Sequence, residues 1–129
     1  MTNLSPGDKL RAVEDGTLDR LLDLDGEIME VGGGYWVKIT ASRIAPDTTR
    51  PHGVEYSLSL FGPDDETVIR YDNAHPIKIG SGPATRQTET SDHVHKKERL
   101  KPYAYCDAET LLVDFWGDVY RVLKEEGVP

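Results

Sequence analysis

The sequence predicts an α+β fold, in which an antiparallel sheet is covered on one face by a C-terminal helix. Three stretches between residues 35 and 71 alternate apolar and polar side chains, as strands with one buried face do. Short turns join the strands, so neighbours are expected to run antiparallel. After residue 107 the apolar residues recur at helical spacing. These observations predict a meander of about four strands and one amphipathic helix, in a single domain spanning residues 1–129.

The expected strands are bounded by turn-forming residues. They cover residues 27–31, 35–42, 54–61 and 67–71. The glycine triplet at 32–34 is expected to form a hairpin turn, because glycine adopts positive φ without strain. The alternation directs Lys38, Ser57 and Arg70 away from the apolar face. This second face is therefore expected to stay open to solvent or to a partner.

Two helices are expected. Asp107 is the predicted cap of the C-terminal helix and Gly127 its end. Its apolar stripe, which is expected to cover the sheet, consists of Leu111, Leu112, Phe115, Trp116, Val119, Val122 and Leu123. A short N-terminal helix is predicted after a Thr17 cap and before Gly26, with a hairpin strand as the alternative. Residues 1–16 are expected to be a poorly ordered lead-in.

The charge balance limits the class of partner. A net charge of -8 argues against a general nucleic-acid binder, because phosphate contacts need cations. The charge is uneven, however: residues 86–101 hold five basic against three acidic residues, whereas residues 1–30 hold three against eight. No apolar run reaches the about 18 residues of a membrane span, and no signal peptide is evident. We therefore expect a cytoplasmic protein without membrane contact, whose single Cys106 is a buried, unreactive thiol.

Histidines concentrate between residues 70 and 95. His93 and His95 lie two positions apart, so in an extended segment both side chains point the same way. One imidazole can then accept a proton while the other donates one, and Asp92 can orient a ring. The alternative is a divalent metal site formed by His75, Asp92, His93 and His95. A solvated surface feature without chemistry is the third interpretation.

The cations near the histidine pair favour one reaction class. Phosphodiester cleavage through a neighbouring 2′-hydroxyl needs a base, an acid and cationic support, but no metal or other cofactor. His93 and His95 supply the base and acid in this hypothesis, and Arg70 and Lys96 contact the phosphate. The candidate substrate-binding residues are thus Arg70, Lys96, Asp72 and Asn73, and the candidate substrate is RNA.

Four segments in the same order resemble the TumE-type toxin family of type II toxin–antitoxin systems. They are Tyr71-Asp72-Asn73-x-His75, Asp92-His93-x-His95, Pro102-Tyr103 and the helix from Leu111 to Val119. The resemblance covers about residues 54–123 and implies a toxin whose partner is an antitoxin protein. Val94 stands where a basic residue is usual, and the segment between the first two motifs is longer. The resemblance assigns no catalytic residues.

Two further functions remain open at this stage. One is a metal-binding protein that uses the aspartate and histidine cluster. The other is a non-enzymatic module whose open sheet face binds a partner chain. A homodimer is compatible with all three hypotheses.

Overall fold

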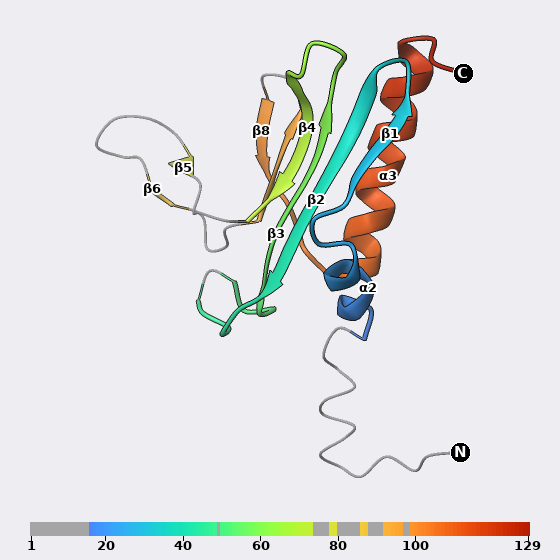
Figure 1. The fold of residues 1–129 in the computed structure, drawn as a ribbon. Helices are drawn as coiled ribbons and strands as arrows, with labels where there is room; N and C mark the ends of the chain where they lie inside the picture. Colours follow the sequence, from blue (N-terminus) through green and yellow to red (C-terminus); the bar gives the residue numbers. More distant parts are fainter. Residues whose placement is uncertain (1–15, 49, 74–77, 80–85, 88–91, 97–98) are drawn as a thin grey trace.

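A computed structural model describes residues 16–48, 50–73, 78–79, 86–87, 92–96 and 99–129 of the chain. Apart from Gly16, the expected lead-in lies outside the described residues, as does His75. The described chain forms a twisted antiparallel sheet with two helices on one face (Figure 1). This confirms the predicted α+β class.

Six strands make up the main sheet. In spatial order they are β1 (Ile28–Gly32), β2 (Tyr35–Arg43), β3 (Val54–Phe61), β4 (Thr67–Asp72), β7 (His93–Lys96) and β8 (Arg99–Pro102). Every neighbouring pair is antiparallel. A separate two-stranded ladder joins β5 (Lys78–Ile79) to β6 (Arg86–Gln87).

The sheet is wider than the about four strands that the sequence predicts. The additional strands are β7 and β8, which hold four residues each and carry no clear apolar alternation. β7 completes the backbone hydrogen bonding of β4, and β8 that of β7. Such a short segment becomes a strand because a partner strand is available, and local sequence does not reveal that partner.

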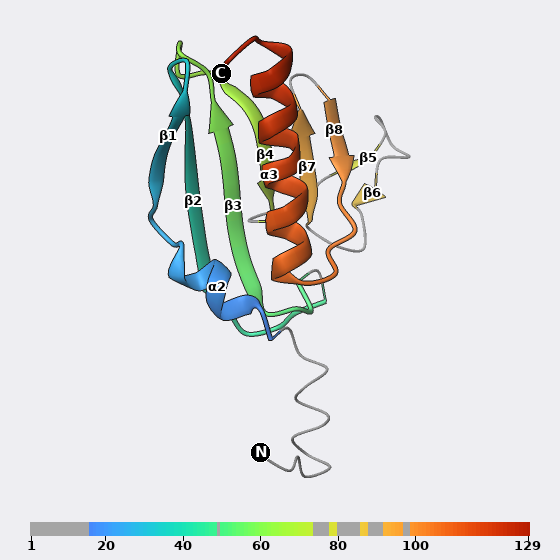
Figure 2. The ribbon, with the colours of Figure 1, turned by 90° about the vertical axis from the view of Figure 1, so that its right-hand side faces the viewer.

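The helix α3 (Ala108–Glu125) lies along one face of the sheet, with α2 (Leu18–Asp23) beside its N-terminal end (Figure 2). Asp107 caps α3 as predicted, because its Oδ1 accepts a hydrogen bond of 2.7 Å from the amide of Thr110. The core between the layers includes Val37, Ile39, Tyr56, Leu58, Leu60, Ile69, Leu111, Phe115 and Val119, all at most 1% exposed. Within the described residues, no helix is long and apolar enough to cross a membrane.

Two local expectations at the helix starts need correction. Thr17 occupies the N-cap position of α2 as expected, but its side chain makes no cap hydrogen bond there; its Oγ1 instead accepts a hydrogen bond of 2.8 Å from the amide of Glu109. The threonine thereby links the starts of both helices. Cys106 is exposed rather than buried, since it precedes the cap of α3 in the connecting segment.

The glycine triplet forms the predicted hairpin turn between β1 and β2. All three glycines have positive φ, which other residues adopt only with strain. At Gly33 an added Cβ would lie 2.8 Å from Cγ2 of Val128. The turn therefore requires glycine for its backbone conformation, and at Gly33 also for the close approach of the C-terminal segment.

Candidate functional site

The histidine pair lies on the face of the sheet opposite α3. Side chains alternate along β7, and Val94 is part of the core that α3 covers. His93 and His95 therefore point to the other face, called the open face below. His95 is exposed, whereas His93 is 5% exposed.

The register of β4 against β7 brings two further polar residues beside the histidines. Arg70 is directly opposite His95, and Asp72 is directly opposite His93. Directly paired residues of antiparallel strands share a face, with Cβ atoms about 5 Å apart. The open face thus carries Arg70, Asp72, His93 and His95 as one group.

A row of side chains continues from this group across the sheet. The register pairs His95 with Arg70, Arg70 with Ser59, and Ser59 with Lys38. The Nε of Arg70 donates a hydrogen bond of 3.1 Å to the Oγ of Ser59, which holds the guanidinium on the sheet. Neither Lys38 nor Arg70 forms an ion pair with any residue that the structure describes. Among the described residues, no carboxylate is therefore paired with either of these two open-face cations.

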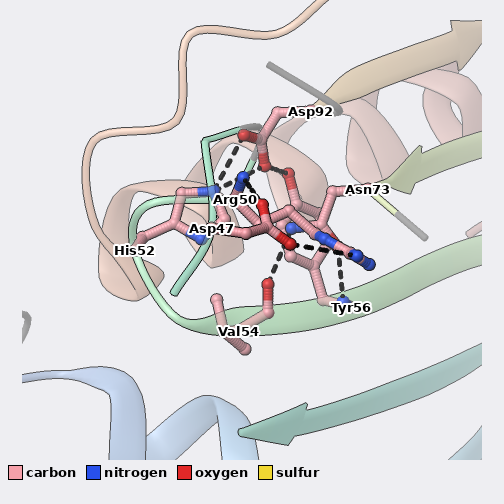
Figure 3. A network of polar contacts seen from close by, with 7 residues as sticks. All are labelled: Asp47, Arg50, His52, Val54, Tyr56, Asn73 and Asp92. Atoms are coloured by element: carbon pink, nitrogen blue, oxygen red, sulfur yellow. Dashed lines mark hydrogen bonds and ion pairs between the residues drawn. The ribbon is translucent and has the colours of Figure 1, made fainter. Parts of the chain in front are cut away.

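Asp92 belongs to a different environment. It precedes His93 by one residue, so the alternation points it toward the α3 side of the sheet. Its Oδ1 accepts a hydrogen bond of 2.6 Å from the hydroxyl of Tyr56, and its Oδ2 is 2.8 Å from Nε2 of His52 (Figure 3). Asp92 does hold an imidazole, but that of His52, which the sequence analysis did not consider.

His52 is fixed in the loop between β2 and β3. Its ring lies over that of Tyr105, with centroids 4.1 Å apart. The same loop is braced by Arg50, whose amide donates a hydrogen bond of 2.6 Å to Asp47 (Figure 3). One ring nitrogen of His52 faces Asp92, and the other, Nδ1, is buried without a hydrogen-bond partner among the described residues. Its Nε2 is engaged with Asp92 and its Nδ1 is buried, so this histidine is suited to a structural role.

Asn73 follows the last residue of β4, and its buried side chain forms hydrogen bonds to the backbone of β3. Its Oδ1 accepts a hydrogen bond of 2.8 Å from the amide of Tyr56, and its Nδ2 donates one of 2.7 Å to the carbonyl of Val54 (Figure 3). The side chain is completely buried. All of these bonds continue the β3–β4 ladder beyond the last strand residue. Asn73 therefore stabilises the strand end on which Asp72 lies.

The electrostatics of the network keep Tyr56 protonated. Burial raises the pKa of its hydroxyl well above the ordinary value of 10, and the neighbouring Asp92 carboxylate raises it further. Ionisation would place a second negative charge against Asp92. Tyr56 therefore acts as a permanent hydrogen-bond donor to that carboxylate.

Lys96 also points away from the histidines. It follows His95, so it lies on the face that α3 covers, with its Nζ 3.0 Å from Oδ2 of Asp118. Arg121 approaches the other oxygen of Asp118 at 2.8 Å, and the hydroxyl of Tyr71 donates to the same carboxylate. Through this ion pair Lys96 joins β7 to α3.

The four residues of the alternative metal site are not gathered. His93 and His95 lie on the open face, Asp92 lies on the opposite face, and His75 is outside the described residues. Within the part of the chain that the structure describes, no group of three or more histidine, cysteine, aspartate or glutamate side chains could hold a metal ion.

A match along most of the chain assigns the protein to a family. A family model described as Toxin TumE matches residues 12–123. The chain belongs to the TumE toxin family. Membership confirms the resemblance and extends it beyond residues 54–123 to include α2 and the β1–β2 hairpin. It indicates a toxin of a toxin–antitoxin system. No curated protein and no solved structure matches the chain.

In this TumE-family protein, the fold separates the predicted site residues into two sets. His93, His95, Arg70 and Asp72 lie together on the open face. Asp92, Lys96 and Asn73 have partners within the fold. Sequence reasoning missed His52 and Tyr56, which hold Asp92 from elements about 40 residues away. The one signal available was that His52 is the only histidine outside the stretch from 70 to 95.

Proposed function

We propose that this protein is the toxin of a toxin–antitoxin pair and that it cleaves RNA at the open face of β7. The observation that carries the proposal is the position of His93 and His95 on that face, with Arg70 directly opposite His95. Its site of action is the cytoplasm, where RNA is the available substrate, and its partner is an antitoxin protein.

The two imidazoles act as base and acid in an in-line displacement. One takes the proton of the 2′-hydroxyl while that oxygen bonds to phosphorus; the P–O5′ bond breaks, and the other imidazole protonates the leaving oxygen. The products are a 2′,3′-cyclic phosphate and a 5′-hydroxyl, and proton exchange with water restores both rings. Residues two apart on a strand are separated by about 7 Å, so a phosphate that lies across β7 against the exposed His95 is also within reach of His93, which is 5% exposed.

Arg70 and Asp72 support the pair. The guanidinium of Arg70 lies beside His95, forms no ion pair with the described residues, and offers donors to the equatorial phosphate oxygens. Asp72 takes the orienting role that the sequence analysis gave to Asp92, because Asp72 is the carboxylate paired with His93 in register. Lys96 and Asn73 have no part in this mechanism, since their side chains are engaged inside the fold.

The test is cleavage of a single-stranded RNA by purified wild-type protein and by His95→Ala. The variant should lose about 10²- to 10⁴-fold in rate, the usual contribution of one acid–base group. The wild-type products should carry 2′,3′-cyclic phosphate ends, and cleavage should persist in a chelator. Thermal unfolding of both proteins should coincide, because His95 is exposed.

A matched control is Lys124→Ala, which removes an exposed side chain from α3. It should cleave like wild type. Equal cleavage by His95→Ala and wild type would remove the catalytic role of the histidine pair. Growth arrest by a His95→Ala protein that no longer cleaves RNA would instead assign the toxicity to binding alone.

A further inference from the structure

An aromatic pair lies on the open face one step from the row of cations. Trp36 and Phe61 are paired in register between β2 and β3, with ring centroids 4.2 Å apart and planes inclined by 20°. Trp36 precedes the core residue Val37, and Phe61 follows the core residue Leu60, so both rings point away from the core. Both are half-buried, which leaves part of each ring accessible.

The aromatic pair is close to the row of cations. Trp36 lies two residues before Lys38 on β2, and Phe61 lies two residues after Ser59 on β3. Two residues along a strand span about 7 Å, and neighbouring strands are about 5 Å apart. The rings, Lys38 and Arg70 therefore form a continuous surface next to the histidine pair.

Charge divides this surface into two parts. Lys38 and Arg70 are free of ion pairs within the described chain, although the whole protein has a net charge of -8. Around the rings the charges are negative: Glu30 is exposed and pairs with Trp36 across β1, and Asp65 accepts a hydrogen bond of 2.9 Å from the indole of Trp36. The two carboxylates repel a phosphate from the rings, whereas Lys38 and Arg70 attract it. An uncharged base can reach the rings between these carboxylates.

We propose that the open face is a binding site for single-stranded RNA, in which a base stacks on the Trp36–Phe61 pair and the backbone runs over Lys38 and Arg70. This inference rests on the proposed function and names its substrate class. Aromatic rings bind bases that are free to leave their own stack, so the site selects single strands over duplexes. A base bound to the two rings would then set the direction in which the RNA strand crosses the row of side chains from Lys38 to His95.

The experiment uses the full chain carrying Trp116→Phe, which leaves Trp36 as the single tryptophan. A 2′-O-methyl RNA oligonucleotide is the probe, because it lacks the nucleophile needed for cleavage. Binding should quench the Trp36 fluorescence in a saturable way, and a duplex of the same sequence should bind more weakly. Phe61→Leu should lower the affinity by about 5- to 150-fold, and Phe61→Tyr should preserve it.

Lys38→Gln tests the backbone contact. It should weaken binding and lower the slope of log affinity against log salt by about 0.7, the value for one phosphate contact to a single strand. The matched control is Lys124→Gln on α3, which should leave both affinity and salt slope unchanged.

The outcomes separate this inference from the proposed function. Unchanged affinity in Phe61→Leu and Lys38→Gln, alongside cleavage that requires His95, would overturn the binding site and leave the ribonuclease. Binding that requires Phe61 and Lys38, without cleavage of ordinary RNA, would support the binding site and overturn the ribonuclease. Equal affinity for duplex and single strand would overturn the inference, as would quenching by the antitoxin protein but not by RNA.

Discussion

His52 and Asp92 lie 40 residues apart in the chain, and their side chains meet with Nε2 2.8 Å from Oδ2. This contact ties the loop between β2 and β3 to the residue at which β7 begins. The carbonyl of Asp92 also accepts a hydrogen bond of 3.0 Å from the amide of Tyr103, beyond β8. Asp92 therefore positions the backbone of His93 from the side opposite the candidate site.

Removing the Asp92 carboxylate should destabilise the protein strongly. Asp92→Ala leaves the hydroxyl of Tyr56 and the ring of His52 without their buried acceptor. Each buried group left without its hydrogen-bond acceptor costs about 1–3 kcal/mol, so urea denaturation should show a loss of about 2–6 kcal/mol for the two together. The control is Asp19→Ala, whose side chain is 88% exposed and pairs with Arg43 on the surface. It should change stability by at most about 0.5 kcal/mol, and an equal effect of the two variants would contradict this role for Asp92.

Alkaline pH should unfold the protein through its buried tyrosines. The pKa of Tyr56 is raised above 10 in the folded state, first by burial and then by Asp92. The unfolded chain therefore releases this proton at a lower pH than the folded protein does. Stability is fully present below about pH 10 and decreases as the pH rises further, by about 1.4 kcal/mol per pH unit for each such group.

Tyr56→Phe tests this sign, because phenylalanine has no proton to release. Above pH 10 its free energy of unfolding should fall less steeply with pH than that of wild type, by about 1.4 kcal/mol per pH unit. Tyr120→Phe is the control, since Tyr120 is 65% exposed, and it should keep the wild-type slope. Identical slopes for wild type and Tyr56→Phe would show that Tyr56 ionises equally in the folded and unfolded states.

The part of the fold that follows from local pattern could be predicted. β2, β3 and β4 alternate clearly, and α3 has a continuous apolar stripe between a capping aspartate and a glycine. β7 and β8 could not be predicted, because a segment such as His93–Lys96 is extended by pairing with its neighbours β4 and β8. Pairing between distant segments depends on the whole chain and leaves no periodic signal in four residues.

The candidate site divides in the same way. Once β7 is extended, the two-residue period places His93 and His95 on one face, as the sequence analysis expected. The same period separates Asp92 and Lys96 from them, a consequence that the sequence-based hypothesis did not draw. The contact with His52 lay beyond sequence reasoning, because it joins a loop to a strand start 40 residues later.

Arg70 should matter for RNA cleavage through both its charge and its shape. Arg70→Gln removes the cation beside His95 and should lower kcat/KM for RNA by about 10²-fold, the usual effect of losing one preorganised donor to the transition state. Arg70→Lys restores the charge without the planar fork, so it should recover only part of the loss. Steady-state kinetics on one oligonucleotide measures all three proteins. A wild-type rate in Arg70→Gln would exclude this arginine as a phosphate contact.

Lys96 should affect stability rather than cleavage. Its ammonium pairs with Asp118 on the α3 side, where Arg121 and Tyr71 also hold the carboxylate. Lys96→Met keeps the aliphatic length and should cost at most about 1 kcal/mol of stability, because the side chain is 34% exposed and the other two partners remain. Cleavage by the folded variant should equal that of wild type, measured by kcat/KM on the same oligonucleotide. A large loss of kcat/KM with unchanged stability would instead mean that Lys96 leaves Asp118 to contact the phosphate.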